Sequence, residues 1–271
     1  MNSKNTDFLI AQLSDLHVRP KDELYKGAVD SNQMLTEAIR HLGQLDRQPD
    51  LVLISGDLVE EGQPEEYLML RELLAEISTP YFVIPGNHDE RERFRAAFAD
   101  HEYLPATGAL HYCIDDYPVR VVALDSCVAG KHYGLLDAVG IDWLETNLAA
   151  CVDKPTIVML HHPPFLSGIP YMDDYRFLEP DRLATVLEKH DNIELVVCGH
   201  LHRSMTRRWA GTVVSSCPST TTEIALQLSR TAKSQSFVGP RACMLHHWQP
   251  DHGLLTHLSN IGTLEGPYPF A

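Results

Sequence analysis

The chain has 271 residues, of which 44% are hydrophobic and 22% charged, and its formal net charge is -15. This composition is typical of a globular protein with a sizeable core and excludes a disordered chain. The negative charge argues against nucleic acid or an anionic membrane as a partner, because the average surface would repel both. A small anion could still bind at a local cationic site.

The organisation of the chain indicates one domain, residues 1–271, because its composition does not change anywhere. Residues 1–7 are polar, and the apolar run at 8–13 is too short for a signal sequence or a membrane span. The six cysteines form no Cys-x-x-Cys pair, which favours reduced thiols over disulfides or a structural zinc site. We therefore expect a cytoplasmic protein.

The first part of the chain predicts alternating strands and helices. Short apolar runs indicate buried strands, and apolar residues at helical spacing indicate helices. In order, these are strand 8–13, helix 33–45 with Ser31 and Asn32 as possible caps, strand 51–54, helix 64–77 and strand 81–84. This βαβαβ order is typical of a site built at the carboxyl ends of strands.

The second part predicts more strands than helices. We expect a short helix at 91–99, strands at 112–114 and 120–124, a helix carrying Trp143, Leu144 and Leu148, a strand at 156–160, a helix opened by Pro180, and strands at 195–198, 212–215, 243–248 and 254–258. Two long loops remain, an aromatic one at 165–178 and a polar one at 216–240. Each is a candidate for a substrate cap or a subunit contact.

Polar side chains with metal-ligand chemistry follow five of the predicted strands. They are Asp15, His17, Asp57, Asn87, His88, His161, His162, His200 and His202. Asp15 and His17, two residues apart, would point the same way if the backbone stayed extended. Carboxylate, amide and imidazole groups without thiolates suit Fe, Mn, Co or Zn. Each piece alone is typical of a turn, but five pieces after five apolar strands favour a common site.

Two metal ions would give this site its chemistry if one carboxylate were shared. Asp57 is the natural bridge, with its two oxygens holding two ions about 3.5 to 4 Å apart. Such a pair attracts an anionic phosphoester and activates a water to hydroxide. His88, beside Asn87, would lie over the open face and protonate the leaving oxygen or donate to a phosphoryl oxygen.

The order of the five pieces resembles the calcineurin-like metallophosphoesterases. Their pattern of Asp-x-His, Gly-Asp, Gly-Asn-His-Asp, His and Gly-His-x-His is matched, between residues 15 and 202, by Asp15-Leu16-His17, Gly56-Asp57, Gly86-Asn87-His88-Asp89, His161 and Gly199-His200-Leu201-His202. The resemblance implies one metal bound by Asp15, His17, Asp57 and His202, and another by Asp57, Asn87, His161 and His200. It also implies that His88 is catalytic, with Asp89 orienting its ring, and that His162 lies outside the metal ligands.

Within that superfamily the chain looks most like bacterial class III cyclic nucleotide phosphodiesterases and glycerophosphodiesterases. The cues are Leu24-Tyr25, the Gly62–Tyr67 stretch and His161-His162-Pro163-Pro164. In the purple acid phosphatases a tyrosine three residues after the Gly-Asp aspartate ligates ferric iron. Here that position is Glu60, so we expect a divalent pair, with iron or manganese among the native ions.

The resemblance implies an α/β fold, a four-layer αββα sandwich of two mixed sheets flanked by helices. We expect a binuclear-metal-dependent hydrolase of small anionic phosphodiesters, with glycerophosphodiesters first and 3',5'-cyclic nucleotides next. A phosphomonoesterase is one alternative, and a catalytically inactive metal-stabilised interaction module is another. The apolar 165–178 loop favours a homo-oligomer, and Arg203, after the last motif, is expected to be an exposed turn residue.

Overall fold

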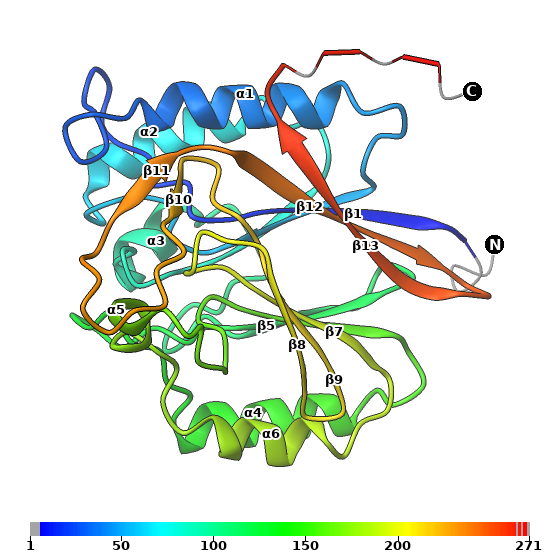
Figure 1. Cartoon of the computed structure of the whole chain (residues 1–271). Helices are drawn as coiled ribbons and strands as arrows, with labels where there is room; N and C mark the ends of the chain where they lie inside the picture. Colours follow the sequence, from blue (N-terminus) through cyan, green and yellow to red (C-terminus); the bar gives the residue numbers. More distant parts are fainter. Residues whose placement is uncertain (1–5, 264, 267, 270–271) are drawn as a thin grey trace.

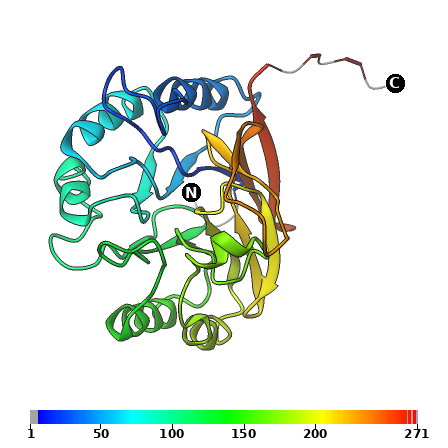
Figure 2. The same ribbon diagram turned by 60° about the vertical axis from the view of Figure 1, so that its left-hand side comes forward.

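The fold consists of two β-sheets stacked face to face, with helices on both outer faces (Figure 1; Figure 2). The computed structural model describes residues 6–263, 265–266 and 268–269. In Figure 1 the layers run from α1 and α2 at the top, through the two sheets, to α4 and α6 at the bottom. The predicted four-layer αββα sandwich is confirmed.

The first sheet has five strands in the order β13-β12-β1-β2-β3. Their bounds are β1 (Phe8–Leu13), β2 (Leu51–Ser55), β3 (Tyr81–Ile84), β12 (Arg241–Gln249) and β13 (Gly253–Ile261). β1, β2 and β3 are parallel, whereas β12 runs antiparallel to β1 and β13 antiparallel to β12. The helices α1 (Ser31–Gly43), α2 (Pro64–Leu74) and α3 (Arg91–Ala97) belong to the layer outside this sheet.

The second sheet has six strands in the order β4-β5-β6-β7-β9-β8. Their bounds are β4 (Tyr112–Ile114), β5 (Arg120–Leu124), β6 (Thr156–Leu160), β7 (Ile193–Cys198), β8 (Met205–Trp209) and β9 (Thr212–Ser216). β5, β6, β7 and β9 are parallel, and the two edge strands are antiparallel. The helices α4 (Ala138–Ala149) and α6 (Pro180–Leu187) cover the outer face of this sheet.

Alternating side chains of the central strands divide the interior into three apolar clusters. In β2, Leu53 packs between the sheets, whereas Val52 and Ile54 pack toward the helices. A strand that is buried on both faces reads as a continuous apolar run rather than an alternating one. The cluster between the sheets also contains Ile10 and Met159, so the sheets are held together by the same strands that end at the polar residues.

The structure corrects several predicted boundaries. The first helix begins at Ser31, and its N-cap is Asp30, whose side chain accepts from the Gln33 N–H. Strand β8 was not predicted. The loops at 165–178 and 216–240 contain a short helix, α5 (Pro170–Asp173), and a two-stranded ribbon of β10 (Thr222–Ile224) and β11 (Ser236–Val238). None of the helices in the described part of the chain is both long and apolar enough to cross a bilayer.

Candidate metal centre

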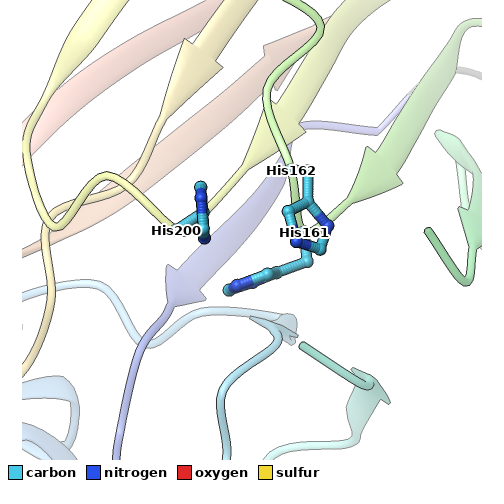
Figure 3. A group of neighbouring side chains, drawn as sticks. All are labelled: His161, His162 and His200. Carbon is cyan, nitrogen blue, oxygen red and sulfur yellow. The ribbon is translucent and has the colours of Figure 1, made fainter. Parts of the chain in front are cut away.

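The strand-end residues of both sheets come together at one edge of the sandwich. The side chains of Asp15, His17, Asp57 and His202 place ligand atoms within 4.8 Å of one another, and so do those of His161, His162 and His200. The last three approach one another from the ends of the neighbouring strands β6 and β7 (Figure 3). Residues up to 187 positions apart in the sequence therefore form one buried cluster, since His202 lies beside Asp15.

Left-handed backbone conformations aim these side chains. The φ angles are 53° at Asp15, 47° at His17, 50° at Asp57, 69° at His200 and 52° at His202. Residues with a Cβ rarely adopt this region, and such strain concentrates at functional sites. The condition under which Asp15 and His17 would point the same way, an extended backbone at 15–17, is therefore not met. These side chains converge because the chain turns sharply where each strand ends.

Four histidines donate one ring N–H to the protein and leave the other nitrogen free. A backbone carbonyl can only accept, so it fixes which nitrogen carries the proton. Ser55 O accepts from His161 Nδ1 at 2.8 Å, Thr222 O from His202 Nδ1 at 2.9 Å, and Tyr175 O from His200 Nε2 at 3.1 Å. At His17 the acceptor of the Nδ1–H is the Glu60 carboxylate, at 2.7 Å. This is the arrangement that metal-ligating histidines require, because the unprotonated nitrogen is the ligand.

His162 differs from these four because both of its ring nitrogens have protein partners. Its Nε2–H donates to His132 O at 3.2 Å, and its Nδ1 lies 2.8 Å from Ser126 Oγ, which can donate to it. Burial and the neighbouring His200 and His161 hold the pKa of His162 well below its ordinary value, so the ring is neutral. A ring with no free nitrogen is a structural support rather than a ligand.

Asp57 lies between the two groups. Its Oδ2 is 3.3 Å from His161 Nε2 and 3.9 Å from His17 Nε2, while its Oδ1 accepts the backbone N–H of His88 at 2.9 Å. Burial raises the pKa of Asp57, but His161 and His88 outweigh burial and hold it well below the usual range. Burial likewise lowers the pKa of His161, but Asp57 and Asp15 raise it to about 9, so at neutral pH a bound cation would replace a proton on Nε2 beside Asp57 Oδ2. The carboxylates thus give the cluster an anionic field that favours cations.

Beside this cluster, the structure gives the His88 ring a different partner from the expected Asp89. His88 Nδ1 donates to Glu60 O at 2.7 Å, and Glu60 Oε2 lies 3.4 Å from the same nitrogen. Asp89 instead accepts from the N–H groups of Gly86 and Leu58 and from the Tyr67 hydroxyl. Its role is therefore to hold the turn between β3 and α3. Burial and the nearby Asp57 carboxylate raise the pKa of Asp89 to about 7.

Residues 8–204 match the calcineurin-like phosphoesterase family. The chain belongs to this family. It is 36% identical over 263 residues, 97% of this chain and 96% of the other, to a probable glycerophosphodiester phosphodiesterase GpdQ of Arcobacter nitrofigilis. It is also 30% identical to the glycerophosphodiester phosphodiesterase GpdQ of Enterobacter lignolyticus, over 96% of this chain and 94% of the other, and 29% identical to the 3',5'-cyclic adenosine monophosphate phosphodiesterase CpdA of Escherichia coli, over 88% and 85%.

Solved structures share the phosphoesterase fold at low identity. A dimetal phosphatase from Danio rerio superposes with a TM-score of 0.63 over 94% of this chain and 99% of the other, at 12% identity. A purple acid phosphatase from yellow lupin seeds does so with a TM-score of 0.65 over 96% of this chain and 54% of the other, at 14% identity. These likenesses concern the fold alone.

The donor atoms of this phosphoesterase fit a pair of metal ions. Asn87 Oδ1 and His161 Nε2 are buried and have no hydrogen-bond partner among the described residues. His17 Nε2 and His202 Nε2 face each other at 3.1 Å although each ring directs its other nitrogen to an acceptor. Buried acceptors without partners are unfavourable unless a bound group satisfies them. A divalent cation would satisfy all of these atoms together.

A cavity of about 620 Å³ opens in front of this cluster. Its lining includes His88 and Asn87 and residues of both long loops, among them Tyr171, Tyr175 and Phe237. Lys26 is the one lysine or arginine among the described residues that line it. Arg203 is only partly exposed. Its guanidinium donates to Ile224 O and forms an ion pair with Glu223, so it stabilises the position of β10.

Three residues near the centre were not recognised from the sequence as site residues. Ser126 and His132 follow β5, which ends at Leu124 and is followed by Asp125 without a histidine or Gly-Asp signal. Glu60 was singled out only because it replaces a tyrosine. The polar cluster after an apolar strand was the available signal for Ser126, whereas nothing in the local sequence distinguished His132.

Proposed function

We propose that this protein hydrolyses small phosphodiesters with two divalent metal ions. The observation that carries the proposal is the set of four histidines, His17, His161, His200 and His202, each held by an acceptor at one ring nitrogen so that the other nitrogen is left for a metal. Asp15, Asp57 and Asn87 supply the oxygen donors. Iron or manganese would suit this mixed nitrogen and oxygen set, as would zinc or cobalt.

The donor atoms divide into two sets that share Asp57. We assign Asp15, His17, Asp57 and His202 to one ion, and Asp57, Asn87, His161 and His200 to the other. Asp57 would contribute to both sets, because its Oδ2 lies 3.9 Å from His17 Nε2 and 3.3 Å from His161 Nε2. A bound metal pair would polarise the phosphoryl oxygens and lower the pKa of the attacking water.

His88 would then act on the leaving oxygen. Its Nδ1–H is engaged by Glu60 O, so Nε2 is the nitrogen that can exchange a proton in the cavity. Burial lowers the pKa of His88, but the Asp57 and Glu60 carboxylates outweigh burial and raise it. A protonated ring in the cavity lining can donate its proton to the departing alkoxide or stabilise a phosphoryl oxygen.

The substrate class follows from the charge of the cavity and from the relatives. Lys26 adds one positive charge to those of the metals, which suits a diester better than a more highly charged monoester. Two relatives carry the name glycerophosphodiester phosphodiesterase, and another is named as a cyclic AMP phosphodiesterase. We place glycerophosphodiesters first and cyclic nucleotides second.

A substrate panel tests this function. The apoprotein is loaded separately with Mn²⁺, Fe²⁺, Co²⁺ or Zn²⁺ and assayed with glycerophosphoethanolamine, cyclic AMP, a bis-aryl phosphate and its mono-aryl analogue. We expect a larger kcat/KM for the diesters than for the monoester. A much larger kcat/KM for the monoester would overturn the diester assignment, and no turnover with any metal would favour an inactive scaffold.

The long loops and the surface support two further parts of the proposal. Residues of the loops at 165–178 and 216–240 line the cavity, so we infer that these two loops form a substrate cap. The apolar 165–178 loop was expected to favour a homo-oligomer, but Phe165, Ile169 and Phe177 are buried against the second sheet. Support for a dimer or larger homo-oligomer comes instead from the exposed apolar side chains of Leu226, Leu228 and Phe237 on the second loop. The six free cysteines suit a reducing cytoplasm. Light scattering on the purified protein measures the oligomeric state.

A further inference from the structure

Asn87 poses a specific problem of orientation. Only the oxygen of an amide can bind a metal, because the NH₂ group has no available lone pair. The two ends of the amide have nearly the same size, so packing alone does not decide which end faces the cluster. In this structure Oδ1 is the buried end without a protein partner, and Nδ2 faces the other way.

The neighbour of Nδ2 is His132. Its Nδ1 lies 3.0 Å from Asn87 Nδ2, and an NH₂ group can only donate, so with the amide in this orientation the His132 Nδ1 is the acceptor and its proton is on Nε2. If the amide turned over, its oxygen would face this nitrogen, and the hydrogen bond would persist only if the His132 proton moved from Nε2 to Nδ1. The contact therefore favours the one orientation in which Asn87 Oδ1 faces the metal cluster.

The position of His132 is in turn stabilised by His162 and Tyr175. Its carbonyl accepts from His162 Nε2 at 3.2 Å, and the other nitrogen of His162 is held by Ser126 Oγ at 2.8 Å. The loop passes directly against the His162 ring, since a Cβ on Gly134 would lie 2.4 Å from His162 Cγ. The His132 ring also packs against Tyr175, with ring centroids 5.5 Å apart. His162 therefore stabilises the position of the loop that carries His132.

We propose that His132 is a positioning residue that selects the metal-binding orientation of the Asn87 amide, and that His162 supports it from behind. The proposal rests on the proposed role of Asn87 as a ligand. His132 acts through Asn87 on the ion that also contacts His161 and His200. Removing the acceptor should weaken the binding of that ion and leave the other unchanged.

Metal titration of the apoprotein tests this without any activity measurement. Apoprotein is titrated with Co²⁺, and the two binding steps are followed by visible absorption. His132→Phe keeps an aromatic ring against Tyr175 but removes the acceptor, and we expect one of the two binding steps to lose about 10- to 100-fold in affinity while the other is unchanged. His132→Asn places an amide oxygen where Nδ1 stood, and we expect affinity within about threefold of the unaltered protein.

Two outcomes would overturn the positioning role. Equal losses in the Phe and Asn variants would mean that the acceptor at this position does not orient Asn87, and unchanged binding in His132→Phe would mean that His132 only fills space. Asn87→Ala separates these results from a failure of the proposed ligand set. If Asn87→Ala binds both ions normally, Asn87 is not a ligand; if it weakens one step and His132→Phe does not, only the positioning role is wrong.

Discussion

Glu60 Oε2 lies 2.7 Å from His17 Nδ1, so a carboxylate outside the metal cluster holds a histidine inside it. The same oxygen is 3.4 Å from His88 Nδ1, and the Glu60 carbonyl accepts from that nitrogen at 2.7 Å. One residue therefore orients a proposed ligand with its side chain and the proposed acid mainly with its backbone. Burial raises the pKa of Glu60, but its bond with His17 outweighs burial and lowers it.

Glu60→Gln should weaken metal binding while leaving the His88 ring in place. The amide is a poorer acceptor than the carboxylate, so the lone pair of His17 Nε2 becomes less basic, and we expect about a 10- to 100-fold loss of affinity at one site. Calorimetric titration with Mn²⁺ measures it. The matched control is Glu61→Gln, which changes the neighbouring exposed carboxylate and its pairing with Arg19. Equal affinity in Glu60→Gln and the unaltered protein would show that this contact does not tune the metal site.

His88→Ala should lower kcat and leave both metals bound, because the His88 ring is not a proposed ligand. The loss of a general acid is expected to cost about 10²- to 10⁴-fold with glycerophosphoethanolamine, whose alkoxide needs a proton to depart. The loss should be smaller with a bis(nitrophenyl) phosphate, whose leaving group is already stable as an anion. Metal analysis is run on the same samples. Loss of a metal in His88→Ala, or equal losses with both substrates, would argue against the acid role.

His246 should make the fold less stable in acid. It is fully buried between Gln12 and Thr256, and burial lowers its pKa to about 3. Between its ordinary pKa of about 6.5 and that value, the unfolded chain binds a proton that the folded chain does not, so stability falls as the pH falls.

The test compares His246→Gln with the unaltered protein by urea unfolding, with metal chelated throughout. Because the glutamine takes up no proton, the variant should lose about 1.4 kcal/mol less stability per pH unit below pH 6. The control is His257→Gln on the neighbouring strand, where the side chain is exposed. Parallel stability curves for His246→Gln and the unaltered protein would show that His246 does not cause the acid sensitivity.

The sequence predicted every fully buried strand and missed three strands that are partly or wholly exposed, β8, β10 and β11. β2 is buried along its whole length, so its apolar run marked it clearly. β8 includes the exposed Arg207 and Arg208 and has no apolar pattern, because its place is set by antiparallel pairing with β9. The ribbon of β10 and β11 is likewise set by pairing between distant segments. A local pattern cannot report a pairing whose partner is elsewhere in the chain.

The same division applies to the site. Asp57 and His200 could be proposed because each follows a buried strand directly, and the carboxyl ends of parallel strands meet at one edge. The residues that orient these groups could not be predicted. Glu60 and His132 lie in loops, and only the path of each loop in the fold brings them to His17 and Asn87. Asp89, although next to His88, turned out to bond to backbone groups of the turn. Residues that are adjacent in sequence, such as His88 and Asp89, do not contact each other's side chains where the chain turns sharply after a strand.

The central claim is that Asp57 joins two metal sites, and metal stoichiometry in two matched variants tests it most directly. Asp15 and Asp57 are both buried carboxylates at strand ends with left-handed φ, but only Asp57 belongs to both proposed donor sets. With folding checked by circular dichroism, we expect two ions in the unaltered protein, one retained ion in Asp15→Ala, and weakened binding of both in Asp57→Ala. Retention of one ion at unaltered affinity in Asp57→Ala would contradict the shared-ligand centre.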